Sequence, residues 1–205
     1  MKISFAARPW MALFGLLLLP ALAAGEDKEA PDKEAAAKEA HEMSLGEGYL
    51  KLKVPGAWKS VEPKVRIIDY EFAAPASEGD EIDGRMTVMG AGGTVEANLD
   101  RWFAQFIQPD GSETKDKAKT EKKKISGQEV HLVDITGTYD DKPGPFVQKP
   151  GVKRPNFRML AAIITTKDAG NYFLKFYGPA KTIGDHEKNF RSIVNSLQAK
   201  QGPVK

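Results

Sequence analysis

The sequence contains no cysteine, and this absence excludes several kinds of chemistry. There can be no disulfide framework, no thiolate nucleophile and no cysteine that carries a lipid at the end of a leader. Histidine is scarce as well, with three residues in 205, and the zinc motif H-E-x-x-H is missing. We therefore expect neither a metal nor another cofactor.

A large excess of one charge is also missing, because the formal net charge is +2. That value averages unlike parts. Residues 1–24 carry +2, residues 25–43 carry seven acids against three lysines for a net of −4, and the rest of the chain carries +4. Dedicated nucleic-acid-binding domains are far more basic. No nucleic acid is expected as a partner.

Long hydrophobic runs are absent outside the N-terminal leader. Residues 1–24 combine two basic residues, an apolar core at 10–19 and an A-L-A exit, which is the pattern of a secretory signal peptide. The core is shorter than the roughly 20 apolar residues that cross a bilayer. We predict cleavage near Ala23 or Ala24 and a periplasmic or secreted protein without a stable membrane span. Retention of the leader as an anchor is the alternative.

Residues 25–44 have little to bury, since Glu, Lys and Ala dominate them and no aromatic residue is present. Such a composition cannot order itself by burial and predicts a solvated spacer, in part a frayed helix. Residues 45–200 then form one domain of about 160 residues, a normal size for a single core. Residues 201–205 are a short tail. We expect a monomer or a weak oligomer.

A buried hairpin is predicted over residues 158–177. Apolar and β-branched residues fill 158–166, turn residues follow at 167–170, and a second aromatic-rich run occupies 172–177. Successive side chains of a strand point to opposite faces, so both faces of this hairpin need cover. One face holds Leu160, Ala162 and Ile164, and the other holds Met159, Ala161 and Ile163.

The remaining periodicities predict further strands and two amphipathic helices. Strands are expected at residues 49–54, 66–74, 85–89 and 128–139, with an exposed strand or hairpin arm at 115–124. Helices are expected at residues 95–107, with Thr94 as the N-cap, and near the C-terminus after a capping box formed by Thr182 and Asp185. Trp58 is expected to close the core. The predicted class is α+β: an antiparallel β-sheet covered by helices on both faces, in an α/β/α sandwich.

This order of elements resembles the PsbP-like fold family. The motifs that carry the resemblance are V-P-G-A-W at 54–58, the Trp-bearing central helix, L-A-A-I-I-T-T running into Y-F-L-K-F-Y-G-P, and F-R-S-I-V-N-S-L at 190–197. The resemblance covers residues 50–197. It implies kinship with an extrinsic photosystem II subunit, exported bacterial proteins and a Ran-binding import factor, a role that export excludes here. Family members bind partners rather than share one chemistry, so no functional residue is transferred.

Motifs for catalysis are missing from the domain. There is no G-x-S-x-G elbow, and packing explains His131 and His186. The acidic loop at 76–84 lacks the spacing of a calcium loop and predicts a solvated turn. The lysines at 115–124 are typical of a protected sheet edge, although they could also attract a polyanion or an anionic membrane surface.

The best candidate for a contact surface is the proline-rich segment 140–157. It reads as a long irregular loop, and such loops are often functional. Aromatic residues and arginines carry much of the energy at interfaces. The candidate residues are Tyr139, Phe146, Lys153, Arg154, Phe157 and Arg158. A plain connecting loop is the alternative.

Two functions stay open at the level of sequence. The first is an exported, non-enzymatic binding or assembly module of the periplasm or cell envelope, whose partner is a protein or an envelope component. The second is an enzyme with a site assembled from scattered residues near the glycine turn at 90–93, with Asn98 and Arg101 as members. The glycine turn lacks the fingerprint of a nucleotide-binding loop and is explained by a tight turn alone.

Overall fold

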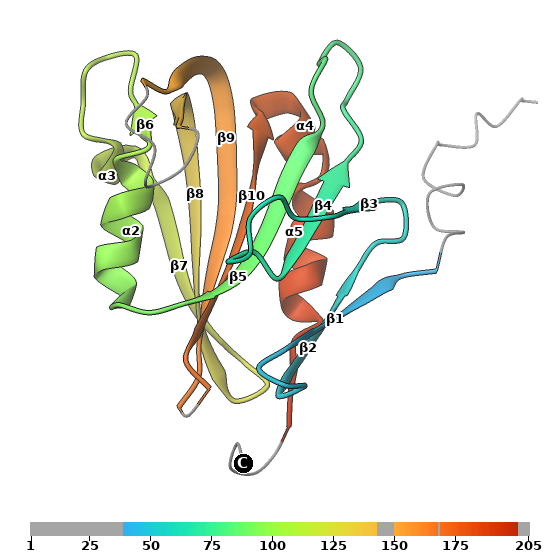
Figure 1. The fold of residues 1–205 in the computed structure, drawn as a ribbon. Helices are drawn as coiled ribbons and strands as arrows, with labels where there is room; N and C mark the ends of the chain where they lie inside the picture. The colour runs from blue at the N-terminus through green and yellow to red at the C-terminus, as the bar shows by residue number, and fades with distance from the viewer. Residues whose placement is uncertain (1–38, 143–149, 168, 201–205) are drawn as a thin grey trace, which may run out of the picture. The chain divides into compact units, whose positions relative to one another are not determined.

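The computed structural model describes residues 39–142, 150–167 and 169–200 (Figure 1). The strands are β1 His41–Leu45, β2 Leu50–Val54, β3 Lys59–Val61, β4 Tyr70–Ala74, β5 Gly84–Ala91, β6 Phe106–Ile107, β7 Lys119–Ile125, β8 Gln128–Asp141, β9 Val152–Thr165, β10 Asn171–Pro179 and β11 Gln198–Ala199. The helices are α2 Val95–Phe103, α3 Thr114–Lys117, α4 Ala180–Asp185 and α5 Glu187–Asn195. The fold is mostly β-sheet with few helices.

The strands form two antiparallel sheets. The large sheet has the order β3-β4-β5-β10-β9-β8-β6, and β7 also pairs with β8. The small sheet has the order β1-β2-β11. The predicted hairpin is confirmed, because β9 and β10 pair from Thr165 opposite Asn171 to Phe157 opposite Pro179. This hairpin lies at the centre of the large sheet (Figure 1).

Two hydrophobic clusters lie on the two faces of the large sheet. One contains Phe190, Ile193 and Val194 of α5, so we call that side the α5 face. The other contains Trp102 and Phe103 of α2 and lies on the α2 face. The alternation predicted for β9 is confirmed. The α5-face cluster includes Leu160, Ala162 and Ile164, and the α2-face cluster includes Met159, Ala161 and Ile163.

The α5 face is packed by more than helices. The small sheet adds five fully or almost fully buried side chains to the same cluster: Met43, Leu45, Leu50, Leu52 and Val54. Trp58 is buried there too, with its ring 4.6 Å from that of Phe176. The α5 face of the large sheet is therefore covered by the small sheet as well as by a helix, whereas helices alone were expected there.

The spacer ends earlier than its composition predicts. Residues 41–44 belong to β1, where Met43 pairs with Leu52 and is fully buried. Met43 and Leu45 stand two residues apart, so both point to the core although charged and polar residues flank them. Two well-spaced apolar side chains are enough to recruit this segment into the small sheet.

Three further boundaries differ from the prediction. Helix α2 ends at Phe103, because Phe106 and Ile107 pair with β8 instead of continuing the helix. Strand β4 begins at Tyr70, and residues 66–69 lie before it. Thr182 is not an N-cap. It lies inside α4, where its hydroxyl donates to Oδ2 of Asp80 at 2.6 Å. At Phe106, Ile107 and Thr182, contacts with distant residues override the local pattern.

Within residues 39–142, 150–167 and 169–200, no helix is both long enough and apolar enough to cross a membrane.

Candidate functional site

The expected contact residues lie on strands rather than in a long irregular loop. Strand β8 continues to Asp141 and β9 begins at Val152, so the predicted loop at 140–157 is much shorter than expected. The error has a physical cause at Pro155. A bulge interrupts the β8–β9 register there, and Asn156 has a φ of 55°. Bulges accept a proline because one residue is left out of the ladder. Phe146 lies outside the described residues.

Beyond this bulge the two strands form a short arm, residues 138–141 and 152–156. Strand β10 ends opposite Phe157, before the arm begins. On the β8 side, β6 pairs with Thr138 and Tyr139. Among the described strands, β8 is the one neighbour of residues 152–156. One edge of the arm is therefore free of strand pairing in the described part of the chain.

An aromatic layer supports the base of the arm on the α2 face. The rings of Tyr139 and Phe157 are stacked, with centroids 6.0 Å apart and planes inclined by 2°. The exposed fractions of these residues are 7% and 8%, so they are not the exposed anchors that the sequence suggested. Burial raises the pKa of Tyr139, because an ionised phenolate would be poorly solvated there.

Charged side chains surround the exposed end of the arm. Lys153 pairs with Asp140 at 3.1 Å and Arg154 pairs with Asp141 at 2.7 Å. The guanidinium of Arg154 also lies 5.9 Å from the centre of the Phe157 ring, within cation–π range. Val152 is 58% exposed. The arm thus offers an exposed apolar side chain, two partly paired cations that follow it in the chain, and a free edge.

Arg158 is separated from the other predicted residues, because it points to the α5 face. Its guanidinium donates two hydrogen bonds of 2.8 Å to Asp134 and one of 2.7 Å to Glu187. Glu187 also accepts from Arg191 at 2.9 Å. Burial alone would raise the pKa of Glu187, but these two arginines outweigh it and the pKa is lowered. Arg158 therefore ties β8 and β9 to α5.

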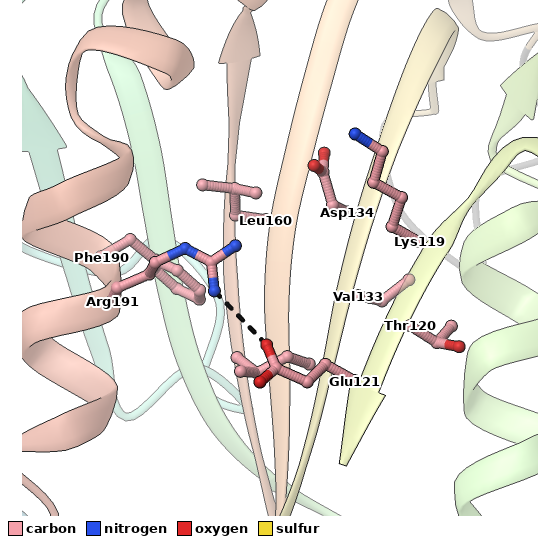
Figure 2. Close-up of a pocket in the computed structure, with 9 residues that line it drawn as sticks. Lys119, Thr120, Glu121, Val133, Asp134, Leu160, Phe190 and Arg191 are labelled. Carbon is pink, nitrogen blue, oxygen red and sulfur yellow. Dashed lines mark ion pairs between the residues drawn. The ribbon is translucent and has the colours of Figure 1, made fainter. Parts of the chain in front are cut away.

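A pocket of about 210 Å³ opens beside this network, between α5 and strands β7 to β9 (Figure 2). Leu132, Leu160 and Phe190 supply apolar surface to it. Figure 2 shows Arg191 and Glu121 pointing toward each other from α5 and β7, and they form an ion pair of 3.6 Å.

The pocket can hold a small apolar group under a polar rim. An apolar cavity of about 150 Å³ can hold benzene. Neither histidine nor cysteine is among the lining residues, and the carboxylate of Asp134 is already held by Arg158. The pocket therefore offers a small ligand three apolar side chains and a rim of charged groups.

The glycine turn at 90–93 is hydrogen-bonded to a side chain of the helix that follows it. The side-chain amide of Asn98 donates to the carbonyls of Gly92 and Thr94, at 3.2 and 2.8 Å. Arg101 in turn donates to Oδ1 of Asn98 at 2.7 Å. Thr94 caps α2 as predicted, because its hydroxyl accepts from the backbone N–H of Ala97. These bonds fix the start of α2.

The two histidines of the domain and the acidic loop also make structural contacts. Nδ1 of His186 accepts from the indole N–H of Trp58 at 3.3 Å, and Nε2 lies 3.0 Å from the carbonyl of Pro75. His131 contacts Glu129 at 2.6 Å. In the acidic loop, Asp80 accepts from the backbone N–H of Thr182 at 3.0 Å. Among the described residues, no three His, Cys, Asp or Glu side chains are placed to hold a metal ion.

The lysine-rich segment contains α3 and the edge strand β7, which pairs with β8. Some of its lysines form ion pairs with carboxylates of β7 and β8. Lys122 pairs with Glu129 at 2.6 Å, and Lys123 with Glu121 at 3.1 Å. This is the pattern of an edge protected by lysine.

A cluster on the α2 face was missed from the sequence. Lys175 is partly exposed on β10, and its Nζ donates to Oε1 of Gln105 at 2.8 Å. Arg85 is held in a two-point ion pair by Glu71, at 2.7 and 2.8 Å, and also donates to the hydroxyl of Tyr177. Burial, and then the charge of Arg85, lower the pKa of Lys175 to about 8. The available signal was F-L-K-F-Y, which puts a lysine at an inward position of a buried strand.

Comparison with known proteins gives structural neighbours alone. No protein-family model matches the chain, and no curated protein matches it. The solution structure of cyanobacterial PsbP (CyanoP) from Synechocystis sp. PCC 6803 is similar, with 13% identity and a TM-score of 0.48 over 78% of this chain and 92% of that one. PA94 of Pseudomonas aeruginosa, a protein of unknown function, has 14% identity and a TM-score of 0.43 over 80% and 99%. Both likenesses are of low sequence identity, and the first is to a PsbP protein.

Proposed function

We propose that this protein is a non-enzymatic binding or assembly module of the periplasm or cell envelope and that the arm is its contact surface. The observation that carries the proposal is the free edge of residues 152–156, which β10 leaves unpaired in the described part of the chain. Unpaired backbone N–H and C=O groups at a sheet edge are a template for an incoming strand.

The side chains of the arm suit a partner of defined chemistry. Val152 offers exposed apolar surface, and Lys153 and Arg154 place two cations beside it. Pro155 lacks a backbone N–H and so limits how far a partner strand can pair. The partner that fits is a protein or envelope component with a short extended segment that carries carboxylates. Tyr139 and Phe157 act beneath this surface by keeping the arm rigid.

The rest of the molecule is the scaffold in this proposal. The large sheet lies between α2 on one face and α5 with the small sheet on the other, and the ion pairs of Arg158 fasten α5 to the strands that continue into the arm. Residues 1–24 act as a signal peptide, and the residues between the leader and β1 act as a spacer. The mature domain works as a monomer or weak oligomer, without a membrane span.

The test is capture from an envelope extract by the immobilised protein. The variant Val152→Asp/Lys153→Glu should reduce capture at least ten-fold, since it removes the apolar contact and reverses one cation. The matched control is Ile67→Asp/Arg66→Glu, which changes an exposed apolar residue and its neighbouring cation in the turn before β4. Equal capture by both variants and the wild type would contradict the assignment of the arm.

A separate assay distinguishes binding from catalysis. The pure protein is incubated with general esterase, phosphatase and glycosidase substrates. We expect no turnover above that of heat-denatured protein. Reproducible turnover that disappears in Arg101→Ala would favour the enzyme near the glycine turn and overturn the binding module.

A further inference from the structure

Lys175 occupies an unusual place for an ammonium group. It stands on the α2 face of β10 between Phe173 and Tyr177, and both neighbours on that face are aromatic. Its Nζ lies 5.4 Å from the centre of the Tyr177 ring and donates to the neutral amide oxygen of Gln105. No carboxylate of the described residues lies within ion-pair distance of it. A ring and an amide replace water poorly around a full charge.

A second cation shares the same ring. Arg85 stands opposite Tyr177 in the β5–β10 register, and its guanidinium lies 5.8 Å from the ring centre. The carboxylate of Glu71 points at Arg85 rather than at Lys175, and it uses both oxygens there. The cluster therefore holds two cations and one carboxylate, a net charge of +1. One negative charge would balance it.

We propose that Lys175 is a nucleophilic amine that captures a small aldehyde or ketone bearing a carboxylate, and that it holds this ligand as an imine. The neutral amine nitrogen attacks the carbonyl carbon. A C=N bond forms, the C–O bond breaks, and the carbonyl oxygen leaves with both amine hydrogens as one molecule of water. No oxidant or reductant is needed. The imine nitrogen then takes up one proton from solvent, which restores the net charge of +1, and the carboxylate of the ligand balances that charge.

The surroundings keep a useful fraction of this amine neutral. The titratable groups that face it are Arg85 from β5, Glu71 from β4 and Tyr177 from β10, with Tyr139 of β8 packed against Tyr177. Burial raises the pKa of Tyr177, so it brings no negative charge near the lysine. At pH 8 about half of an amine with a pKa of about 8 is neutral, against on the order of 0.4% for an ordinary lysine of pKa about 10.4.

The test compares the labelling rates of two lysines, Lys175 and Lys124, in the same molecule. The full chain is treated at pH 8 with glyoxylate and cyanoborohydride, which reduces each imine to a stable secondary amine, and peptide mass spectrometry follows every lysine. Lower basicity also lowers nucleophilicity, as it does for thiols. We therefore expect Lys175 to react on the order of ten times faster than exposed Lys124, rather than a hundred times faster. Its rate should rise up to about pH 8 and level off above pH 9. In urea the two lysines should react alike.

Two further measurements change the charge of the aldehyde and the charge of Arg85 and follow the labelling rate of Lys175. Glyoxylate should label Lys175 several-fold faster than acetaldehyde does, with no such preference at Lys124. Arg85→Met should slow labelling at Lys175, while Arg85→Lys, which keeps the charge, should slow it less. Equal rates at Lys175 and Lys124 in the folded wild type would overturn the proposal, and this comparison needs no variant. Equal rates with both aldehydes would overturn the carboxylate preference. None of the residues changed or labelled here belongs to the arm, so either result leaves the capture assay independent.

Discussion

Replacing Arg158 by glutamine should destabilise the domain by about 3 kcal/mol, because two carboxylates then lose the cation between them. The side chains of Arg158, Asp134 and Glu187 are 16%, 15% and 28% exposed. Breaking a buried pair from one side costs about 3–5 kcal/mol, and the partial exposure of Glu187 places this case at the low end. At roughly 2–4 °C per kcal/mol for a domain of this size, the melting temperature should fall by about 6–12 °C.

Arg191→Gln is the matched control. Arg191 pairs with Glu187 in an i,i+4 contact on α5 and with Glu121 at 3.6 Å, but its side chain is 44% exposed. Such pairs contribute about 0.3–0.5 kcal/mol. Urea unfolding at pH 7, followed by circular dichroism, gives both values. A loss below about 1 kcal/mol for Arg158→Gln, or equal losses for the two variants, would refute the reasoning.

The difference in unfolding free energy between wild type and Arg158→Gln should also depend on pH in a defined direction. The arginines lower the pKa of Glu187 below its ordinary value of 4.5 in the folded state. A depressed carboxyl pKa stabilises the fold above the unfolded pKa, and this stabilisation is lost as pH falls through the folded pKa. The gap between wild type and Arg158→Gln should therefore be full at pH 6–7 and should narrow below about pH 4.5. A gap that widens in acid would contradict the assigned partners.

Three other changes test the fold. Deleting residues 25–40 should leave the melting temperature almost unchanged. Extending the deletion through residue 44 should lower it by at least ~4 °C, because it removes four of the five residues of β1, buried Met43 among them. Equal effects in differential scanning calorimetry would contradict the role of β1. Thr94→Ala should cost about 1 kcal/mol in urea unfolding and Thr94→Ser much less, since Thr94 caps α2; a neutral alanine would show the cap to be dispensable. Gly84→Ala should cost about 1–3 kcal/mol, because a Cβ there would stand 2.7 Å from the Phe176 ring; an unchanged unfolding midpoint would mean that the ring moves away at no cost.

The central hairpin could be predicted because its signal is local and two-sided. In residues 159–164 every side chain is apolar, so a strand was the one element that could serve two clusters at once. Longer-range pairing was not visible in the same way. Phe106 and Ile107 fit a continued helix by spacing, yet β8 offers them strand partners from thirty residues further along the chain. The periodicity of a short segment contains no information about a strand partner so far away in the sequence.

The placement of the candidate contact residues differs in part from what the sequence predicts. Prolines at 150 and 155 indicated a loop, and a bulge instead let the strand continue through Pro155. Tyr139 and Phe157 were expected at the surface, but their stacked rings became part of the core under the arm. The Lys175 cluster could not be assembled from sequence, because its members come from β4, β5 and β10 and meet through register alone.

The small sheet also sets when the domain can fold. Strand β2 pairs with β1 before it and with β11 at the end of the domain, and the backbone N–H of Lys53 donates to the hydroxyl of Ser196, 143 residues away. At about 5–20 residues per second, a ribosome needs roughly 7–30 s to make the chain between these partners. Until then the inner side chains of β2 lack α5 and β11. A nascent chain with this topology stays open until its last strand has been made, and during that interval it is available to chaperones and to any machinery that carries unfolded polypeptides.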